Sequence, residues 1–253
     1  MDRDQSWRVV TEERLSLADL LEGLTDAEWE TPSLCAGWRV RDVAAHVAMA
    51  PQVPGVWSMT KNGIRAGGRF HKLNHDVAVR HADSRSPGSL VAELREHAWS
   101  RRLPVVTNYR NIVFDVLVHG QDIALPLGRT RRMPRDAAAT GATRVWTMGW
   151  PFWARRRLRG LRLVATDVGW TAGAGHEVSG PIDVLLLLLT GRVDAALPRL
   201  SGPGLTHLAR AGAHGRDAGR QTTRSAPPGS VQDMSRQDPR GVLETTREQS
   251  DIE

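Results

Sequence analysis

Three residues that are able to bind a metal ion stand on two stretches with helical spacing: His46, Asp115 and His119. Asp115 and His119 are four residues apart, a spacing that stacks two side chains on one face of a helix. His46 borders an apolar stripe over residues 40–47, so it faces inward from a second helix. Two imidazoles and a carboxylate suit a divalent cation, and three protein ligands leave a coordination position open. The pattern predicts a half-open metal site.

Burial is the reason to expect a strong partner for these side chains. The stretch 111–125 is apolar almost all round, which predicts a helix at the centre of a bundle. A carboxylate and an imidazole inside such a helix are costly unless each is paired. A buried pair of Asp115 and His119 without metal is the alternative interpretation. Asp122, one turn past His119, is a candidate fourth ligand or a hydrogen-bond partner that orients His119.

Other residues have weaker claims to chemistry. A rival histidine cluster, His71, His75 and His81, lies in a polar stretch that we interpret as a solvated helix face. Arg192 is a candidate anchor for the anion of a substrate or of a thiol, with a helix-end arginine that contacts backbone as the alternative. Cys35 is interpreted as a small, partly buried thiol rather than as a nucleophile.

Composition limits the class of protein. The 253 residues, 40% of them apolar, are enough for a substantial core. The single cysteine excludes an intrachain disulfide framework and a multi-cysteine zinc module. The longest apolar run, 182–189, is too short to cross a bilayer, and no signal-peptide pattern opens the chain, so we expect a cytoplasmic protein without a membrane partner. The net charge is +6, but the arginine run at 155–157 lacks a groove-reading pattern, so we expect no nucleic-acid partner.

The pattern of apolar and polar residues divides the chain into three parts. Helical spacing recurs in the stretches 17–24, 40–47, 90–98, 111–125 and 134–146. Beyond them, residues 161–166 alternate as a strand does, a glycine-rich segment follows at 169–175, and 181–190 reads as a leucine-rich helix. We therefore predict a helical bundle over 1–152, a small α+β domain over 153–212 and a disordered tail over 213–253.

Three segments carry a resemblance to a known family. Residues 29–38 (WETPSLCAGW), 40–47 (VRDVAAHV) and 114–123 (FDVLVHGQDI) resemble the mycothiol-dependent maleylpyruvate isomerase family. That family belongs to the wider group of DinB-like metal-binding four-helix bundles. The likeness runs from about residue 7 to residue 210. It implies a mainly α fold, a DinB-like four-helix bundle followed by a smaller α+β C-terminal domain.

The resemblance also implies a ligand set and cofactors. The family's metal ligands fall on His46, Asp115 and His119, with Glu in the isomerase proper where this chain has Asp115. Zinc is the usual metal. Mycothiol, the small thiol of actinobacteria, is the usual cosubstrate. A cation favours the deprotonated form of a thiol, so the protein itself needs no catalytic cysteine.

The ligand set leaves the reaction open. In an isomerase the thiolate would add to a conjugated double bond, allow rotation and leave again, whereas in an S-transferase it would stay attached to the electrophile. A non-catalytic metal- or thiol-binding module and a thiol-independent metal hydrolase are the alternatives. We expect mycothiol and a small electrophile as partners of a monomer or homodimer.

Overall fold

The computed structural model describes residues 1–52, 70–103 and 107–208, which belong to one compact unit. The predicted disordered tail, 213–253, lies outside the described residues. In chain order the elements are α1 (Arg3–Glu22), α2 (Asp26–Trp29), α3 (Val40–Met49), α5 (Phe70–Asp83), α6 (Pro87–Glu96), α7 (Tyr109–Ala124), α8 (Arg135–Thr147), α9 (Ala154–Arg157), β1 (Leu161–Ala165), β2 (Thr171–Gly173), β3 (His176–Gly180), α10 (Ile182–Leu189), α11 (Val193–Ala196) and the 3-10 helix η1 (Leu197–Arg199).

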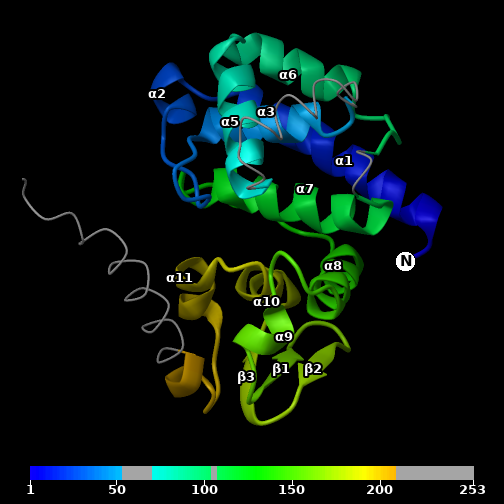
Figure 1. The fold of residues 1–253 in the computed structure, drawn as a ribbon, viewed down its shortest axis with the longest axis vertical. Coiled ribbons are helices and arrows are strands. Elements are labelled where there is room, and N and C mark those ends of the chain that lie inside the picture. The colour runs from blue at the N-terminus through cyan, green and yellow to red at the C-terminus, as the bar shows by residue number, and fades with distance from the viewer. Residues whose placement is uncertain (53–69, 104–106, 209–253) are drawn as a thin grey trace, which may run out of the picture. The chain divides into compact units, whose positions relative to one another are not determined.

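Four helices form the bundle (Figure 1): α1 packs against α6 and α7, and α3 packs against the same two helices. The first helix begins with a capping box, in which the Asp2 carboxylate accepts from the Gln5 backbone and the Gln5 amide oxygen accepts from the Asp2 backbone. Its core face carries Leu17 and Leu21, both fully buried. The predicted mainly helical class is therefore confirmed.

Helix α7 is the central element, because α1, α3 and α8 all pack against it. Contacts on several sides explain why its sequence is apolar almost all round, with Val113, Leu117 and Ile123 buried. The Asn108 side chain caps its start by accepting from two backbone N–H groups of the first turn. The helix predicted over 111–125 thus occupies the central place expected for it.

The second region combines a small sheet with helices. Its strand order is β2-β1-β3, with β1 antiparallel to β2 and parallel to β3. The fully buried side chains of Leu163 and Val178 lie opposite each other in β1 and β3. Helix α10 packs against α8 and also contacts both of these strands, which explains its run of buried leucines. The smaller α+β part is confirmed, while the predicted boundary after residue 152 stays a prediction.

Candidate metal centre

The donor atoms of His46, Asp115 and His119 all lie within 4.8 Å of one another. Helix α7 supplies Asp115 and His119 from successive turns, and α3 supplies His46. His46 Nε2 is 3.7 Å from Asp115 Oδ2, and His119 Nε2 is 3.5 Å from Asp115 Oδ1. The structure therefore brings together the three side chains that the sequence singled out.

These separations fit a bound cation. Metal–ligand bonds of about 2.0–2.1 Å in tetrahedral geometry place neighbouring donor atoms about 3.3 Å apart. The two imidazole nitrogens lie 3.7 and 3.5 Å from different oxygens of Asp115, and one donor atom of each residue lies within 4.8 Å of the other two. Two imidazoles and a carboxylate are also a common donor set for zinc. The side chains of His46 and Asp115 are 21% and 30% exposed, so the group is partly open to solvent. The donor set and its spacing thus pass the test for a divalent metal.

A tryptophan forms one wall of this group. The Trp38 ring lies parallel to His119, with centroids 6.4 Å apart and an interplanar angle of 7°. It also meets His46 edge-on at 5.4 Å. The loop that carries it is held closed, because the Ser33 hydroxyl and backbone N–H both donate to the Trp38 carbonyl. Trp38 therefore restricts the rotation of both candidate ligand imidazoles.

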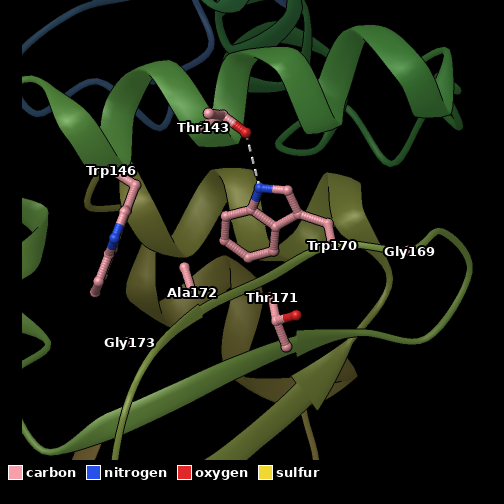
Figure 2. Close-up of a pocket in the computed structure, with 7 residues that line it drawn as sticks. All are labelled: Thr143, Trp146, Gly169, Trp170, Thr171, Ala172 and Gly173. Carbon is pink, nitrogen blue, oxygen red and sulfur yellow. Dashed lines mark hydrogen bonds between the residues drawn. The ribbon is translucent and has the colours of Figure 1, made fainter.

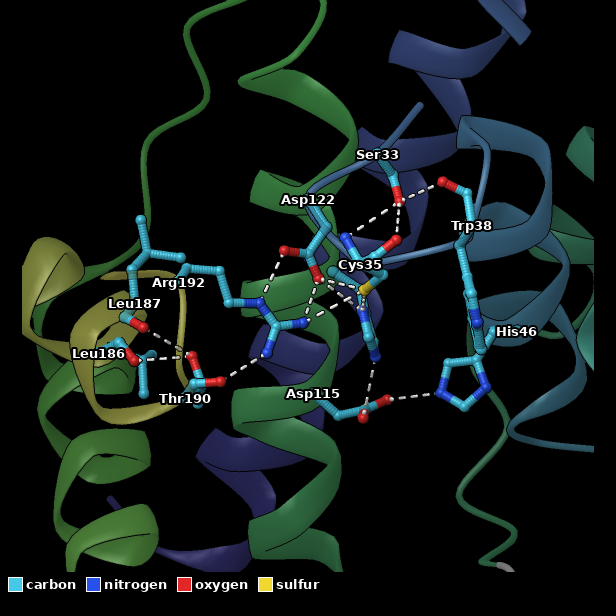
Figure 3. A network of polar contacts seen from close by, with 11 residues as sticks. Ser33, Cys35, Trp38, His46, Asp115, Asp122, Leu186, Leu187, Thr190 and Arg192 are labelled. Carbon is cyan, nitrogen blue, oxygen red and sulfur yellow. Dashed lines mark hydrogen bonds and ion pairs between the residues drawn. The ribbon is translucent and has the colours of Figure 1, made fainter. Parts of the chain in front are cut away.

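The other ring nitrogen of His119 faces a second polar group, drawn in Figure 3. His119 Nδ1 is 2.9 Å from Asp122 Oδ2, and the Cys35 thiol donates to the same oxygen at 3.1 Å. Arg192 binds both oxygens of Asp122, from Nε at 2.9 Å and from Nη2 at 2.6 Å. The Asp122 side chain is 0% exposed. This carboxylate is thus saturated by donors from three different segments.

The sulfur, imidazole and carboxylate of Cys35, His119 and Asp122 also lie close enough together to hold an ion. However, the Arg192 guanidinium already supplies a positive charge to Asp122, and its Nη2 donates to Cys35 Sγ at 3.3 Å. A metal here would face that fixed cation. The geometry consequently favours the His46 side of His119 as the metal side.

The pKa values of both carboxylates, Asp115 and Asp122, differ from those of an ordinary aspartate. Burial opposes ionisation of Asp115, but His119 and His46 outweigh it and hold the pKa of Asp115 below its usual range. Burial also opposes ionisation of Asp122, and the hydrogen bonds from His119 and Arg192 again hold its pKa low. For His119, burial is outweighed by Asp115 and then Asp122, so the pKa of this imidazole is raised. A cation that binds these groups must therefore compete with a proton on His119.

The remaining sequence candidates have other partners. His81 Nε2 pairs with Glu93 at 2.7 Å, and His75 lies beside Asp76 and edge-on to Trp38. The His71 side chain lies outside the described residues. Neither His75 nor His81 joins a group of metal donors within the described part of the chain. The rival cluster thus gains no support as a metal site.

Arg192 makes the backbone contact of a helix-end arginine, and it adds contacts to two side chains that the sequence did not predict. Its Nη1 donates to the Thr190 carbonyl at 2.8 Å, as a helix-end arginine does, while the rest of the guanidinium binds Asp122 and Cys35. An anchoring role toward an outside anion stays a prediction. Sequence reasoning missed that Cys35 and Trp38 border the site, since both stand in a loop whose path depends on tertiary contacts. The sequence signal that could have placed them there is their position in the loop directly before the helix that carries His46.

The surface also carries a depression of about 540 Å³, lined by Trp146, Thr143 and the glycine-rich segment 169–173 (Figure 2). The Trp170 indole N–H donates to the Thr143 hydroxyl at 3.0 Å across it. None of the candidate metal ligands lines this depression. It is therefore a separate feature.

The fold and the donor set together define a class: helical-bundle proteins with a candidate metal site between facing helices. Residues 10–103 match the family described as the mycothiol maleylpyruvate isomerase N-terminal domain. This match includes His46 and ends before α7. The family predicted from sequence is confirmed.

Two solved structures are similar to the chain: the mycothiol-dependent maleylpyruvate isomerase and a single-residue mutant of it. Each has a TM-score of 0.55 and 15% sequence identity, and each alignment covers 80% of this chain and 93% of the other. At that identity the likeness shows a shared fold. No curated protein matches the chain. No helix in the described residues has the length and apolar character needed to cross a membrane.

Proposed function

We propose that the protein is a mycothiol-dependent isomerase that holds a divalent metal ion with His46, Asp115 and His119. The observation that carries the proposal is the convergence of these donor atoms within 4.8 Å on a partly open face. The family of the N-terminal part supports the thiol and the reaction class. Zinc is the metal that we propose, because imidazole and carboxylate ligands suit it.

The proposed division of labour follows from the contacts. When bound, the cation would supply the positive charge that favours the thiolate form of mycothiol near neutral pH. His46 and Asp115 hold the open side, and Trp38 limits the rotation of the imidazoles. The Cys35 thiol donates to a buried carboxylate, which suits a packing role better than that of a nucleophile. The sulfur nucleophile is therefore proposed to come from outside.

The experiment has two steps. Elemental analysis of the purified protein measures metal per chain, and a metal-edge absorption spectrum with and without mycothiol reports whether sulfur joins the ligands. Maleylpyruvate is then followed by NMR with mycothiol present, absent, or replaced by another thiol. We expect about one metal per chain and isomerisation that requires mycothiol. Loss of mycothiol without isomerised product would support an S-transferase, and turnover without any thiol would support a hydrolase.

The transferase is kept as the second candidate because of Asp115. Its side chain is one methylene shorter than the Glu found in the isomerase proper, and it is 30% exposed. A shorter ligand leaves more room beside the open position. Asp115→Glu tests the effect of side-chain length: faster isomerisation with unchanged metal content would show that the shorter Asp115 slows this reaction, and mycothiol that stays attached to the product in both proteins would support the transferase. A cytoplasmic location and a monomer or homodimer remain predictions.

A further inference from the structure

Arg192 reaches the candidate metal centre because of the way α10 ends. The Gly191 N–H donates to the Leu188 carbonyl and the Arg192 N–H to the Leu187 carbonyl, which together form a Schellman motif. Gly191 has φ +94°, a backbone conformation that residues with a side chain rarely adopt. This turn takes the chain out of the helix and directs Arg192 toward α7 (Figure 3). The position of the guanidinium is therefore built into the backbone.

The guanidinium fixes Asp122 in one orientation. It binds both carboxylate oxygens, while its Nη1 stays bonded to the Thr190 carbonyl. A bidentate contact restricts the rotation of a carboxylate more than a single bond does. With Arg192 in place, Oδ2 points at His119 Nδ1, 2.9 Å away. A carboxylate paired with a guanidinium accepts hydrogen bonds only, so His119 must donate from Nδ1.

We propose that Arg192 is a positioning residue: acting through Asp122, it holds the His119 ring with Nδ1–H donated inward and Nε2 turned toward His46 and Asp115. An imidazole whose Nδ1 carries the proton keeps its Nε2 lone pair free for a cation. This proposal deepens the proposed function and rests on it for the identity of the bound cation. The ring orientation itself can be observed without any metal.

A matched control exists in the same bundle. Arg131 forms the comparable buried ion pair with Glu13, at 2.6 Å and with side chains 7% and 9% exposed, and neither residue contacts a candidate ligand in the described structure. The Arg131 side chain also lies against Gly120 of α7, so replacing Arg131 reports what the loss of a buried ion pair beside this helix does when neither partner touches a candidate ligand. Arg192→Met, Arg192→Lys and Asp122→Asn are compared with Arg131→Met and Arg131→Lys.

The sign of the change in metal affinity separates positioning from electrostatics. Removing the Arg192 charge by itself would strengthen the binding of a nearby cation. Loss of positioning would weaken it, roughly 10- to 100-fold by analogy with other partners of metal-bound histidines. We expect the zinc affinity of Arg192→Met and Asp122→Asn, measured by competition with a chelating dye, to fall at least about tenfold. Arg131→Met should stay within about twofold of wild type.

Arg192→Lys keeps the charge but loses the planar fork, so it tests geometry if the Met variant fails to fold. We expect it to lose zinc affinity as well. Full wild-type affinity in Arg192→Lys, or unchanged or higher affinity in Arg192→Met, would overturn the proposal.

A second readout does not depend on metal. The ring N–H of His119 donated to Asp122 should give a slowly exchanging proton resonance in metal-free protein, identified by its loss in His119→Gln. We expect it in wild type and Arg131→Met, and expect it to vanish in Arg192→Met. Its persistence in Arg192→Met contradicts the positioning role. Wild-type protein that binds no zinc would refute the proposed function, while this resonance would still decide the role of Arg192.

Discussion

Asp115 and Asp122 stand seven residues apart on one helix, and both border His119, yet their surroundings are opposite. Asp122 is fully buried and receives hydrogen bonds from Arg192, His119 and Cys35. Asp115 is 30% exposed and faces imidazole nitrogens at 3.5 and 3.7 Å, longer than good hydrogen bonds. Within the described structure, no guanidinium is hydrogen-bonded to Asp115. One carboxylate is satisfied by the protein, and the other retains the capacity to bind a cation.

The difference shows that residue type and helical spacing do not decide the role of a carboxylate. Neighbours from other segments decide it: the end of α10 brings a guanidinium to Asp122, whereas α3 brings a second imidazole to Asp115. A carboxylate with a guanidinium attached to both oxygens is a structural partner. A carboxylate between two imidazoles is a ligand candidate.

The largest expected effect comes from removing the residue that both sides share. His119→Ala deletes one donor of the metal group and leaves Asp122 without one of its hydrogen bonds. We expect stoichiometric metal binding to disappear, because two remaining ligands hold a divalent cation poorly, while circular dichroism shows the helical fold retained. Zinc that stays at one per chain in elemental analysis of the variant would contradict the assignment.

A second test concerns the partly exposed side of the site, where His46 lies beside Asp115. His46→Ala and His75→Ala each remove an imidazole that meets the Trp38 ring edge-on, at 5.4 and 6.1 Å. Only His46 belongs to the donor group. We expect zinc affinity to fall by more than roughly 100-fold in His46→Ala, beyond the effect of losing an outer partner, and to stay unchanged in His75→Ala. Equal losses in both variants would instead implicate packing around Trp38.

A third test concerns the backbone turn at Gly191, which directs Arg192 toward the buried Asp122. Gly191→Ala places a Cβ at φ +94°, 3.3 Å from the guanidinium of Arg157. We expect it to lower the free energy of unfolding by about 1–3 kcal/mol, measured by urea denaturation. Gly88→Ala is the control, because a Cβ there meets no atom within 4 Å in an ordinary helix and should be neutral or slightly stabilising. Equal effects at the two glycines would argue against strain at Gly191.

The smallest effect concerns another satisfied carboxylate. Burial raises the pKa of Glu93, but hydrogen bonds from His81 and Arg85 outweigh it and lower the pKa below the ordinary 4.5. Such a group stabilises the fold above its unfolded pKa and loses that contribution as the pH falls through its folded pKa. Glu93→Gln should therefore cost at most about 1 kcal/mol at pH 7, and the cost should shrink below about pH 4.5, measured by urea denaturation across pH. A cost that does not change with pH would exclude the ionised form as its source.

The helical part of the fold was predictable because its periodicity is strong. The stretch 111–125 is apolar almost all round and lies at the centre of the bundle, as its pattern indicated. Strand β1 was also predicted within 161–166. Strand β3 was not, because only Val178 and Gly180 of its five residues are buried and such a short alternation is ambiguous.

The candidate site was predictable in part for the same reason. Asp115 and His119 share a helix, so spacing alone places them together, and His46 was inferred from the inner edge of a second helix. The contact between Arg192 and Asp122 spans 70 residues of sequence. It depends on a left-handed turn at Gly191 and on how α10 packs, neither of which a periodic pattern encodes. Sequence reasoning therefore found the candidate donors and Asp122 as a partner of His119, and it missed the guanidinium that holds Asp122 in place.

The long separation between Arg192 and Asp122 has a consequence for biosynthesis. Because translation proceeds from the N-terminus, every residue of the bundle leaves the ribosome before Arg192 does. Until then, Asp122 has no guanidinium partner and must stay hydrated or take up a proton. A nascent chain that ends before Arg192 lacks the contact that orients the imidazole of His119, so metal loading is expected to follow synthesis of the segment that contains Arg192.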